Sequence, residues 1–371
     1  MGLVDHHCHG VVPGDLDRRS FEGLITEGFD PAPEGTSHFD SPVGLAIRRW
    51  CAPVLELSPL PSPEEYLTRR AELGAEEVHR RFLQSAGLEA LLVETGHIMG
   101  TDLLGPAAME LLAAAPAHQV VRLETVAEAV GREGVDAAAY PDAFARALEE
   151  VAAGAVGLKT VVAYRGGYKL DPRRPSTSEV VDAVGRWLSK HGAPRLDDPV
   201  LLRHGIWTGA ELARDRGLPL QIHAGYGDPD LTLHLVNPSL LTDFVRTLGQ
   251  LRVDVVFLHC YPYLREAAYL AAVFPHVYFD VGLALHYTGP GAVRVLAEAL
   301  ELAPFTKQLY SSDGFALAEF HYLGALLFRR SLAAILEDWV RREECSAADA
   351  DRIAGLLGHA NAHRIYLLGD G

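Results

Sequence analysis

The sequence predicts an α/β fold, a single (β/α)8 TIM barrel over residues 1–371. Three observations lead to this prediction. A length of 371 residues fits one large barrel domain. Short apolar runs rich in β-forming residues recur along the chain, and stretches with helical periodicity lie between most of them. Nearly continuous apolar strands that alternate with helices are typical of a parallel sheet covered on both faces.

Eight segments are expected to form the strands of the barrel. They occupy residues 3–9, 90–95, 120–125, 155–164, 218–225, 253–260, 276–282 and 307–313. Residues 140–154 illustrate the helices expected between them, because Pro141 stands at the start of the periodic run and Gly154 at its end.

Two insertions interrupt the alternation of strands and helices. Residues 10–89 are rich in Pro and Gly at first and then helical, and we expect them to form a lid over the active site. Residues 165–217 form the second insertion. From Ala316 onward the chain has a helical pattern, and this segment is expected to wrap the barrel.

Composition excludes several classes of protein. A net charge of −16 argues against binding to nucleic acid, which requires a basic surface. No apolar run is long enough to span a bilayer, and polar residues stand where a signal peptide would be apolar. The four cysteines are far apart and form no CxxC pair, so we expect reduced thiols and a cytoplasmic protein. The expected partner is a small molecule, and a homo-oligomer is left open.

The segment LVDHHCHG (3–10) is unusually rich in metal-binding side chains. Because side chains alternate along a strand, we expect Asp5, His7 and His9 on one face. His6 and Cys8 would then face the outer layer of the barrel. Two imidazoles two residues apart on one face can bind the same metal ion, and Asp5 would brace one of them.

Further polar side chains stand at the ends of apolar strands. They are Lys159, His223, His259 and Asp313. A barrel collects the C-terminal ends of its strands on one face, so these side chains should converge with His7 and His9. Imidazole and carboxylate are good ligands for Zn, Mn or Fe. A carboxylate beside a metal-bound water can accept its proton, a role that we expect for Asp313.

The order of these residues resembles that of the amidohydrolase superfamily of metal-dependent hydrolases. The segments 218–231, 257–283 and 302–314 resemble its amidohydrolase-2 branch, in particular the FluG-type domain that occurs alone or fused to a glutamine-synthetase-like domain. The segments GLKTVVAYRGG (157–167) and VVRLET (120–125) are similar to strands of the same family. The similarity extends over about residues 1–370 and is weakest over 10–60.

The resemblance implies a distorted barrel that binds a divalent metal, with Zn favoured over Mn or Fe. The implied ligands are His7, His9, His223 and Asp313. In one-metal members, His259 contacts the attacking water or the substrate. In two-metal members, His223 and His259 hold a second ion and a carboxylated Lys159 bridges the pair. Lys159 could equally stay an ammonium group that binds a substrate carboxylate. The number of bound ions, one or two, is therefore left open.

Several side chains are candidates for binding substrate. Arg122, Lys159 and Arg165 could form a cationic pocket for a carboxylated molecule. Tyr164 follows the fourth strand, and His286 follows the seventh; both are candidates to line the same pocket.

The alternative for the cationic pocket is a set of internal ion pairs. Arg122 and Glu124 would share a face of the third strand, and Arg122 could pair there with Glu124 or with Glu94. Glu94 and His97 are expected to contact ligands rather than the metal, and Asp280 is expected to be structural or to orient a ligand imidazole.

The predicted activity is cleavage of a C–N amide bond by metal-activated water. Asp313 would act as the general base, and His259 and Lys159 would stabilise the oxyanion. The association with glutamine synthetase suggests a γ-glutamyl or other carboxylated amide. The alternatives are a decarboxylase of a small unsaturated or aromatic acid, a lactonase on the same site, and a barrel without activity that serves as a binding module.

Overall fold

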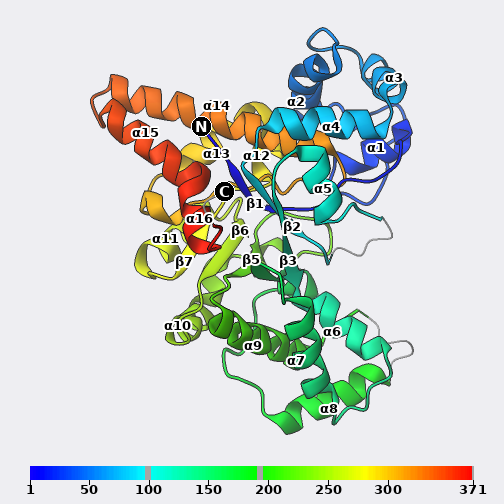
Figure 1. The fold of residues 1–371 in the computed structure, drawn as a ribbon, viewed down its shortest axis with the longest axis vertical. Coiled ribbons are helices and arrows are strands. Elements are labelled where there is room, and N and C mark those ends of the chain that lie inside the picture. Colours follow the sequence, from blue (N-terminus) through cyan, green and yellow to red (C-terminus); the bar gives the residue numbers. More distant parts are fainter. Residues whose placement is uncertain (97–101, 190–194, 370–371) are drawn as a thin grey trace.

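The computed structural model describes residues 1–96, 102–189 and 195–369. In these residues, seven parallel strands form one curled sheet surrounded by helices (Figure 1). The strands pair in chain order: β1 (Val4–Cys8), β2 (Ala90–Glu94), β3 (Ala117–Arg122), β4 (Gly157–Thr160), β5 (Leu220–Ala224), β6 (Val255–His259) and β7 (Val277–Phe279). Parallel strands in sequential order, joined by helical connections, are the arrangement of a (β/α)8 barrel. The predicted fold class is confirmed.

Alternate side chains of the strands pack on opposite faces of the sheet. One set, which includes Val4 and Leu258, forms a buried cluster with Ile365 and Tyr366 near the C-terminus. The other set, which includes Phe257, packs with the surrounding helices in the main core. Burial on both faces explains why these strands are apolar over nearly their whole length.

The expected eighth strand, 307–313, is the main departure from a regular barrel. It contains the end of a 3-10 helix (Phe305–Lys307) and one isolated bridge from Gln308 to β7, but no strand. Its backbone nevertheless closes the ring: Leu309 N–H donates to β7 at 3.0 Å, and the Tyr310 carbonyl accepts from β1 at 3.2 Å. Its last residue, Asp313, has a left-handed backbone with φ of +49°.

The third strand lies three residues earlier than expected, and the fourth strand is shorter than expected. The third ends at Arg122, and Leu123 begins a helix, so the prediction that Glu124 lies on this strand is wrong. The Glu124 carboxylate instead accepts hydrogen bonds from the Thr160 hydroxyl and from Val161 N–H. It therefore satisfies backbone at the point where β4 ends and a 3-10 helix begins.

The first insertion is mostly helical, as expected. Its helices are α1 (Arg18–Leu24), α2 (Pro42–Ala46), α3 (Pro63–Leu73) and α4 (Ala75–Ala86), with a π-helical turn (Ile47–Cys51) and a 3-10 turn (Ala52–Leu55). Ser62 begins α3 with a capping box, in which its side chain and Glu65 satisfy each other's backbone N–H groups. These helices gather beside one end of the sheet (Figure 1).

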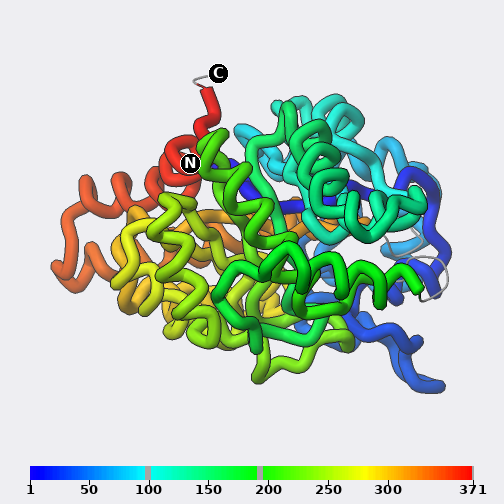
Figure 2. Tube along the Cα trace, turned by 90° about the horizontal axis from the view of Figure 1, so that it is seen from below, coloured from blue at the N-terminus to red at the C-terminus, as the bar shows by residue number. Residues whose placement is uncertain are grey.

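The remaining helices surround the sheet, and the last of them packs against the inward-facing side chains of the strands. They are α5 (Pro106–Ala113), α6 (Leu123–Arg132), α7 (Tyr140–Val151), α8 (Thr177–Leu188), α9 (Pro199–Arg216), α10 (Thr242–Gln250), α11 (Leu264–Val273), α12 (Ala284–Thr288), α13 (Ala292–Ala299), α14 (Ala318–Arg341), α15 (Ala347–Gly355) and α16 (Asn361–Ile365). The C-terminal helices run along the barrel, as predicted: α14 packs on α4 and α13, and α16 ends beside β1 near the N-terminus (Figures 1 and 2).

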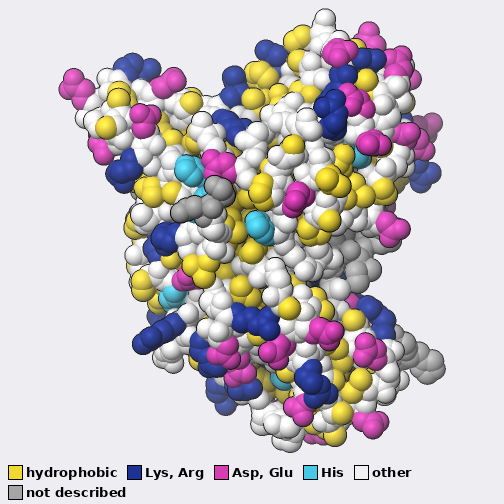
Figure 3. All heavy atoms as spheres, in the orientation of Figure 1, with side chains coloured by type: hydrophobic (Ala, Val, Ile, Leu, Met, Phe, Trp, Pro, Cys, Tyr) yellow, Lys and Arg dark blue, Asp and Glu magenta, His cyan; other side chains and the backbone are white. Residues whose placement is uncertain are grey.

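The surface carries charges of both signs. On the face shown in Figure 3, basic and acidic side chains are interspersed, in keeping with the net charge of −16 and without a continuous basic area. Across the described part of the chain, no helix combines the length and apolar character needed to cross a bilayer.

Candidate metal centre

Side chains from distant segments meet at the C-terminal ends of the strands. Asp313 Oδ1 lies 3.3 Å from His7 Nε2 and 3.5 Å from His9 Nε2. His259, the last residue of β6, faces the other carboxylate oxygen, with Nε2 3.3 Å from Oδ2. The structure thus brings these four sequence-predicted residues together around one carboxylate.

The protonation states of this group suit a cation. Burial opposes ionisation of Asp313, but the neighbouring imidazoles, His259 foremost, hold its pKa well below the usual value. Burial lowers the pKa of His7 to about 3 and that of His259 to about 4. An ionised carboxylate and neutral imidazoles are the forms that bind divalent metals.

His223 completes the group at the end of β5. Its ring centroid lies 4.8 Å from that of His259, and the Tyr164 hydroxyl lies 3.5 Å from its Nδ1. His223 Nε2 is buried and has no hydrogen-bond partner in the described part of the chain. A buried imidazole nitrogen without a partner, beside neutral imidazoles and a carboxylate, fits a divalent metal ion.

A buried hydrogen-bond chain fixes the tautomer of His7. Gln221 Nε2 donates to the His6 carbonyl at 2.9 Å and to the Tyr366 hydroxyl at 2.8 Å. Gln221 Oε1 therefore faces His7 Nδ1, 2.8 Å away, which must carry the donated proton. The lone pair of His7 is left on Nε2, the atom that faces Asp313.

The Glu94 carboxylate faces His9 Nδ1, as the Gln221 amide faces His7 Nδ1. Glu94 Oε2 is 3.6 Å from His9 Nδ1 and also forms an ion pair with Arg122. Burial opposes ionisation of Glu94, but Arg122 and His9 outweigh it and hold the pKa at about 2. Glu94 thus contacts a candidate ligand, as predicted, while His97 lies outside the described residues.

His259 reaches the site through unusual backbone geometry. Leu258 faces the barrel interior, so regular alternation would point His259 outward. The left-handed backbone of His259, with φ of +72°, turns its ring inward instead. Asp280 accepts a hydrogen bond from its N–H, and Gly282 leaves room for the ring, because an added Cβ would lie 2.2 Å from Nδ1.

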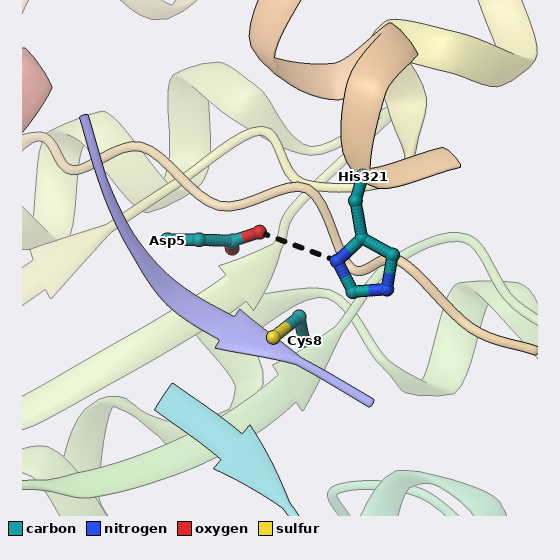
Figure 4. Close-up of side chains that lie close together, drawn as sticks. All are labelled: Asp5, Cys8 and His321. Atoms are coloured by element: carbon teal, nitrogen blue, oxygen red, sulfur yellow. Dashed lines mark ion pairs between the residues drawn. The ribbon is translucent and has the colours of Figure 1, made fainter. Parts of the chain in front are cut away.

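The expected alternation along β1 is wrong for Asp5 and His6, because the strand contains an irregularity between Asp5 and Cys8 where the register with β2 shifts; Cys8 packs in the outer core as expected. His6 points inward, with Nε2 2.7 Å from Asp280 Oδ2 and Nδ1 2.9 Å from the Tyr366 hydroxyl. Asp5 points outward to Ser312 and lies beside Cys8 (Figure 4). It braces the residue before Asp313, not an imidazole.

Lys159 lies within the same group. Its Nζ is 3.4 Å from His7 Nε2. Burial lowers its pKa to about 8, while the nearby carboxylates of Asp313 and Glu94 counteract that shift. The side chain therefore stands beside the candidate ligands and also borders the cavity in front of them.

A cavity of about 430 Å³ opens onto these residues. All the predicted substrate-binding residues line it: Arg122, Tyr164, Arg165 and His286. Residues 23–24 and 26–29 of the first insertion line it too, so the insertion borders the cavity.

Two of the arginines expected in the cationic pocket form internal ion pairs and also border the cavity. Arg122 pairs with Glu94, and Arg165 pairs with Glu128 at 3.2 Å, yet both arginines border the cavity. Glu124 forms no ion pair with Arg122 in the described chain, so that part of the alternative is wrong.

Some residues of the site escaped sequence analysis. Gln221 lies two residues before His223 and so shares its strand face. This spacing could have identified Gln221 from the sequence. Glu27 borders the cavity from the insertion, where nothing in the sequence distinguishes it; burial raises its pKa to about 7 although Tyr287 donates a hydrogen bond to it. Arg195 borders the cavity and donates to the Tyr164 carbonyl at 2.8 Å.

Comparisons with known proteins agree with this arrangement. Protein fluG of Emericella nidulans is 27% identical over 412 aligned positions, which cover 99% of this chain and 46% of that protein. The chain thus spans about half the length of this curated relative. A crystal structure from Lactobacillus casei ATCC 334, described as a "putative metal-dependent hydrolase", is 29% identical with a TM-score of 0.85 and covers 99% of this chain and 95% of its own.

More distant structures share only the fold. The uronate isomerase of Thermotoga maritima is 14% identical with a TM-score of 0.66, over 99% of this chain and 94% of its own. The sequence profile of the amidohydrolase family matches residues 99–368, most of the chain. The chain therefore belongs to the amidohydrolase family.

Proposed function

We propose that this protein hydrolyses a C–N amide bond in a small carboxylated molecule, with a divalent ion, zinc in the first place, held by His7, His9, His223 and Asp313. The observation that carries the proposal is the meeting of these side chains at the floor of the cavity, with His223 Nε2 lacking any partner among the described residues.

Each side chain has a task in this proposal. A bound ion supplies a water of lowered pKa and polarises the scissile carbonyl. Asp313 accepts the proton of the attacking water at Oδ2 and passes it to the leaving amine. His259 and Lys159 donate hydrogen bonds to the developing oxyanion. Lys159 either stays an ammonium group or is carboxylated as a bridge between two ions. The number of ions bound per chain distinguishes these two states.

The substrate class is inferred from the arginines and from the FluG-type resemblance. Arg165 and Arg122 border the cavity and would orient a substrate carboxylate, with Tyr164 and His286 beside it. The link with glutamine-synthetase-like domains favours a γ-glutamyl amide.

We further propose that residues 1–371 act as one cytoplasmic domain with 10–89 as its lid.

A substrate panel tests the reaction. Zinc-loaded protein would be incubated with γ-glutamyl amides, with small unsaturated and aromatic acids, and with lactones. We expect release of amine from the amides. Release of CO2 from an acid, or opening of a lactone with no amine from any amide, would replace the proposal by the corresponding alternative.

A further inference from the structure

A second group of metal-binding side chains lies behind β1, on the side facing α14. Asp5 and Cys8 come from β1, and His321 comes from the first turn of α14. One ligand atom from each lies within 4.8 Å of the others, and all three side chains are fully buried. Asp5 and His321 point toward each other, with Cys8 beside them (Figure 4).

Some polar atoms in and beside this group lack protein partners, whereas Cys8 Sγ donates a hydrogen bond to the Leu92 carbonyl at 3.7 Å. Neither ring nitrogen of His321 has a hydrogen-bond partner among the described residues; Nδ1 approaches Asp5 Oδ2 only to 3.9 Å. The nearby Tyr310 hydroxyl is also buried without a partner in the described chain. Such atoms are rare in native proteins unless a water or an ion fills the place beside them.

The Asp5 carboxyl group is buried without a cationic partner in the described chain, and this burial raises its pKa to about 7. The group accepts hydrogen bonds from Ser312 N–H at 2.8 Å and from the Ser312 hydroxyl. No lysine or arginine of the described chain forms an ion pair with it. Buried carboxylates are normally paired with a cation or bound to a metal, and this one keeps free lone pairs.

We propose that Asp5, Cys8 and His321 bind a second, structural ion of the zinc type, separate from the ion in the cavity. Carboxylate, thiolate and imidazole are all zinc ligands, and ligand atoms of one tetrahedral site lie roughly 3.4 to 3.8 Å apart. The Asp5–His321 distance is 3.9 Å and all three ligand atoms lie within 4.8 Å of one another, so the side chains need to close by up to about 1 Å to bind one ion. Cys8 loses its proton to solvent on binding, so its thiolate and the Asp5 carboxylate balance the two charges of the ion.

The position of this site gives it a structural task. Its ligands join β1, which carries His7, to α14, and Asp5 also holds Ser312 beside Asp313. The ion would therefore fasten together segments that form the cavity floor without touching the substrate.

Cobalt(II) distinguishes the two sites. The residues in the cavity offer only nitrogen and oxygen, so a thiolate-to-cobalt charge-transfer band in the near ultraviolet reports a cysteine ligand. We expect this band in the full-length cobalt protein and in His9→Ala. Cys8→Ser should lose the band and one equivalent of metal, whereas Cys51→Ser and Cys345→Ser, which alter thiols outside the group, should keep both.

Several outcomes would overturn the inference. A cobalt protein without the band, or a band that survives in Cys8→Ser, excludes Cys8 as a ligand; so does an ordered water found at this position instead of an ion. If Cys8→Ser does not fold, X-ray absorption of the zinc-loaded wild type decides, since a sulfur neighbour at about 2.3 Å is required. Metal in the cavity without the band would contradict the second site but not the proposed function. The band without amide turnover would support the second site and contradict the proposed function.

Discussion

At the scale of single residues, Asp313 is the side chain on which turnover depends most. Asp313→Asn keeps the shape and one oxygen but removes the proton acceptor, so we expect kcat/KM to fall by about 10²–10⁴-fold. Metal content by mass spectrometry should stay above half of the wild-type value. Asp338→Asn, an exposed change on α14, is the matched control. Full activity of Asp313→Asn would remove this residue as the base.

His9→Ala tests the site itself. The change removes one imidazole that faces Asp313 at 3.5 Å, so we expect loss of the metal in the cavity and of amide turnover. The circular dichroism spectrum should match that of the wild type, because His9 follows β1 rather than forming its core. An active His9→Ala protein that retains all its metal would contradict the assignment.

Gly282 is a residue where lack of a side chain decides the position of a neighbour. An added Cβ would lie 2.2 Å from His259 Nδ1, and φ is +40° at this position. We expect Gly282→Ala to displace His259 and reduce kcat at least tenfold while the protein still folds. Gly185→Ala is the control, because its Cβ meets nothing within 4 Å in the middle of α8. Equal activity of the two variants would show that His259 is not needed in this position.

At the scale of elements, the chain end after α16 supports the ligands on β1 from within the barrel. The Tyr366 hydroxyl accepts from Gln221 and contacts His6 at 2.9 Å. Tyr366→Phe leaves one N–H of the Gln221 amide and His6 Nδ1 without a partner, which costs about 1–3 kcal/mol of unfolding free energy. Urea denaturation measures this loss, and Tyr269→Phe, exposed on α11, should cost nothing. Unchanged stability and metal affinity in Tyr366→Phe would show that the chain of hydrogen bonds is dispensable.

The elements also show where prediction from sequence succeeded and failed. Apolar runs located the seven strands to within a few residues at most boundaries, and strand ends identified His223, His259 and Lys159 because polar residues are unusual there. The irregularity in β1 reversed the expected directions of Asp5 and His6, since one extra residue shifts the side-chain alternation. Glu124 was misplaced because its carboxylate binds backbone at the end of β4, a contact that periodicity does not reveal.

At the scale of the whole molecule, buried histidines make stability depend on pH. Burial lowers the pKa of His286, which stacks on Phe320, to about 3 from the usual value of 6.5. Below pH 6.5 the unfolded chain takes up a proton that the folded chain refuses, so stability is complete above that pH and is lost as pH falls toward 3. Urea denaturation of metal-free protein from pH 7 to pH 4.5 should show this decline. His286→Gln should reduce its slope, and an identical slope would contradict the cause.

The sequence by itself determined the parallel barrel, the chemical type of the site and most of its members. These depend on local periodicity and on residue type at strand ends, which can be read without knowing long-range contacts. Only the tertiary structure decided which nitrogen of His7 faces Asp313, that Arg122 is paired with Glu94, and that an irregular segment closes the ring. The physical reason is separation along the chain. Gln221 and His7 are 214 residues apart, and their hydrogen bond exists only because the folded barrel places β5 and β1 across one interior.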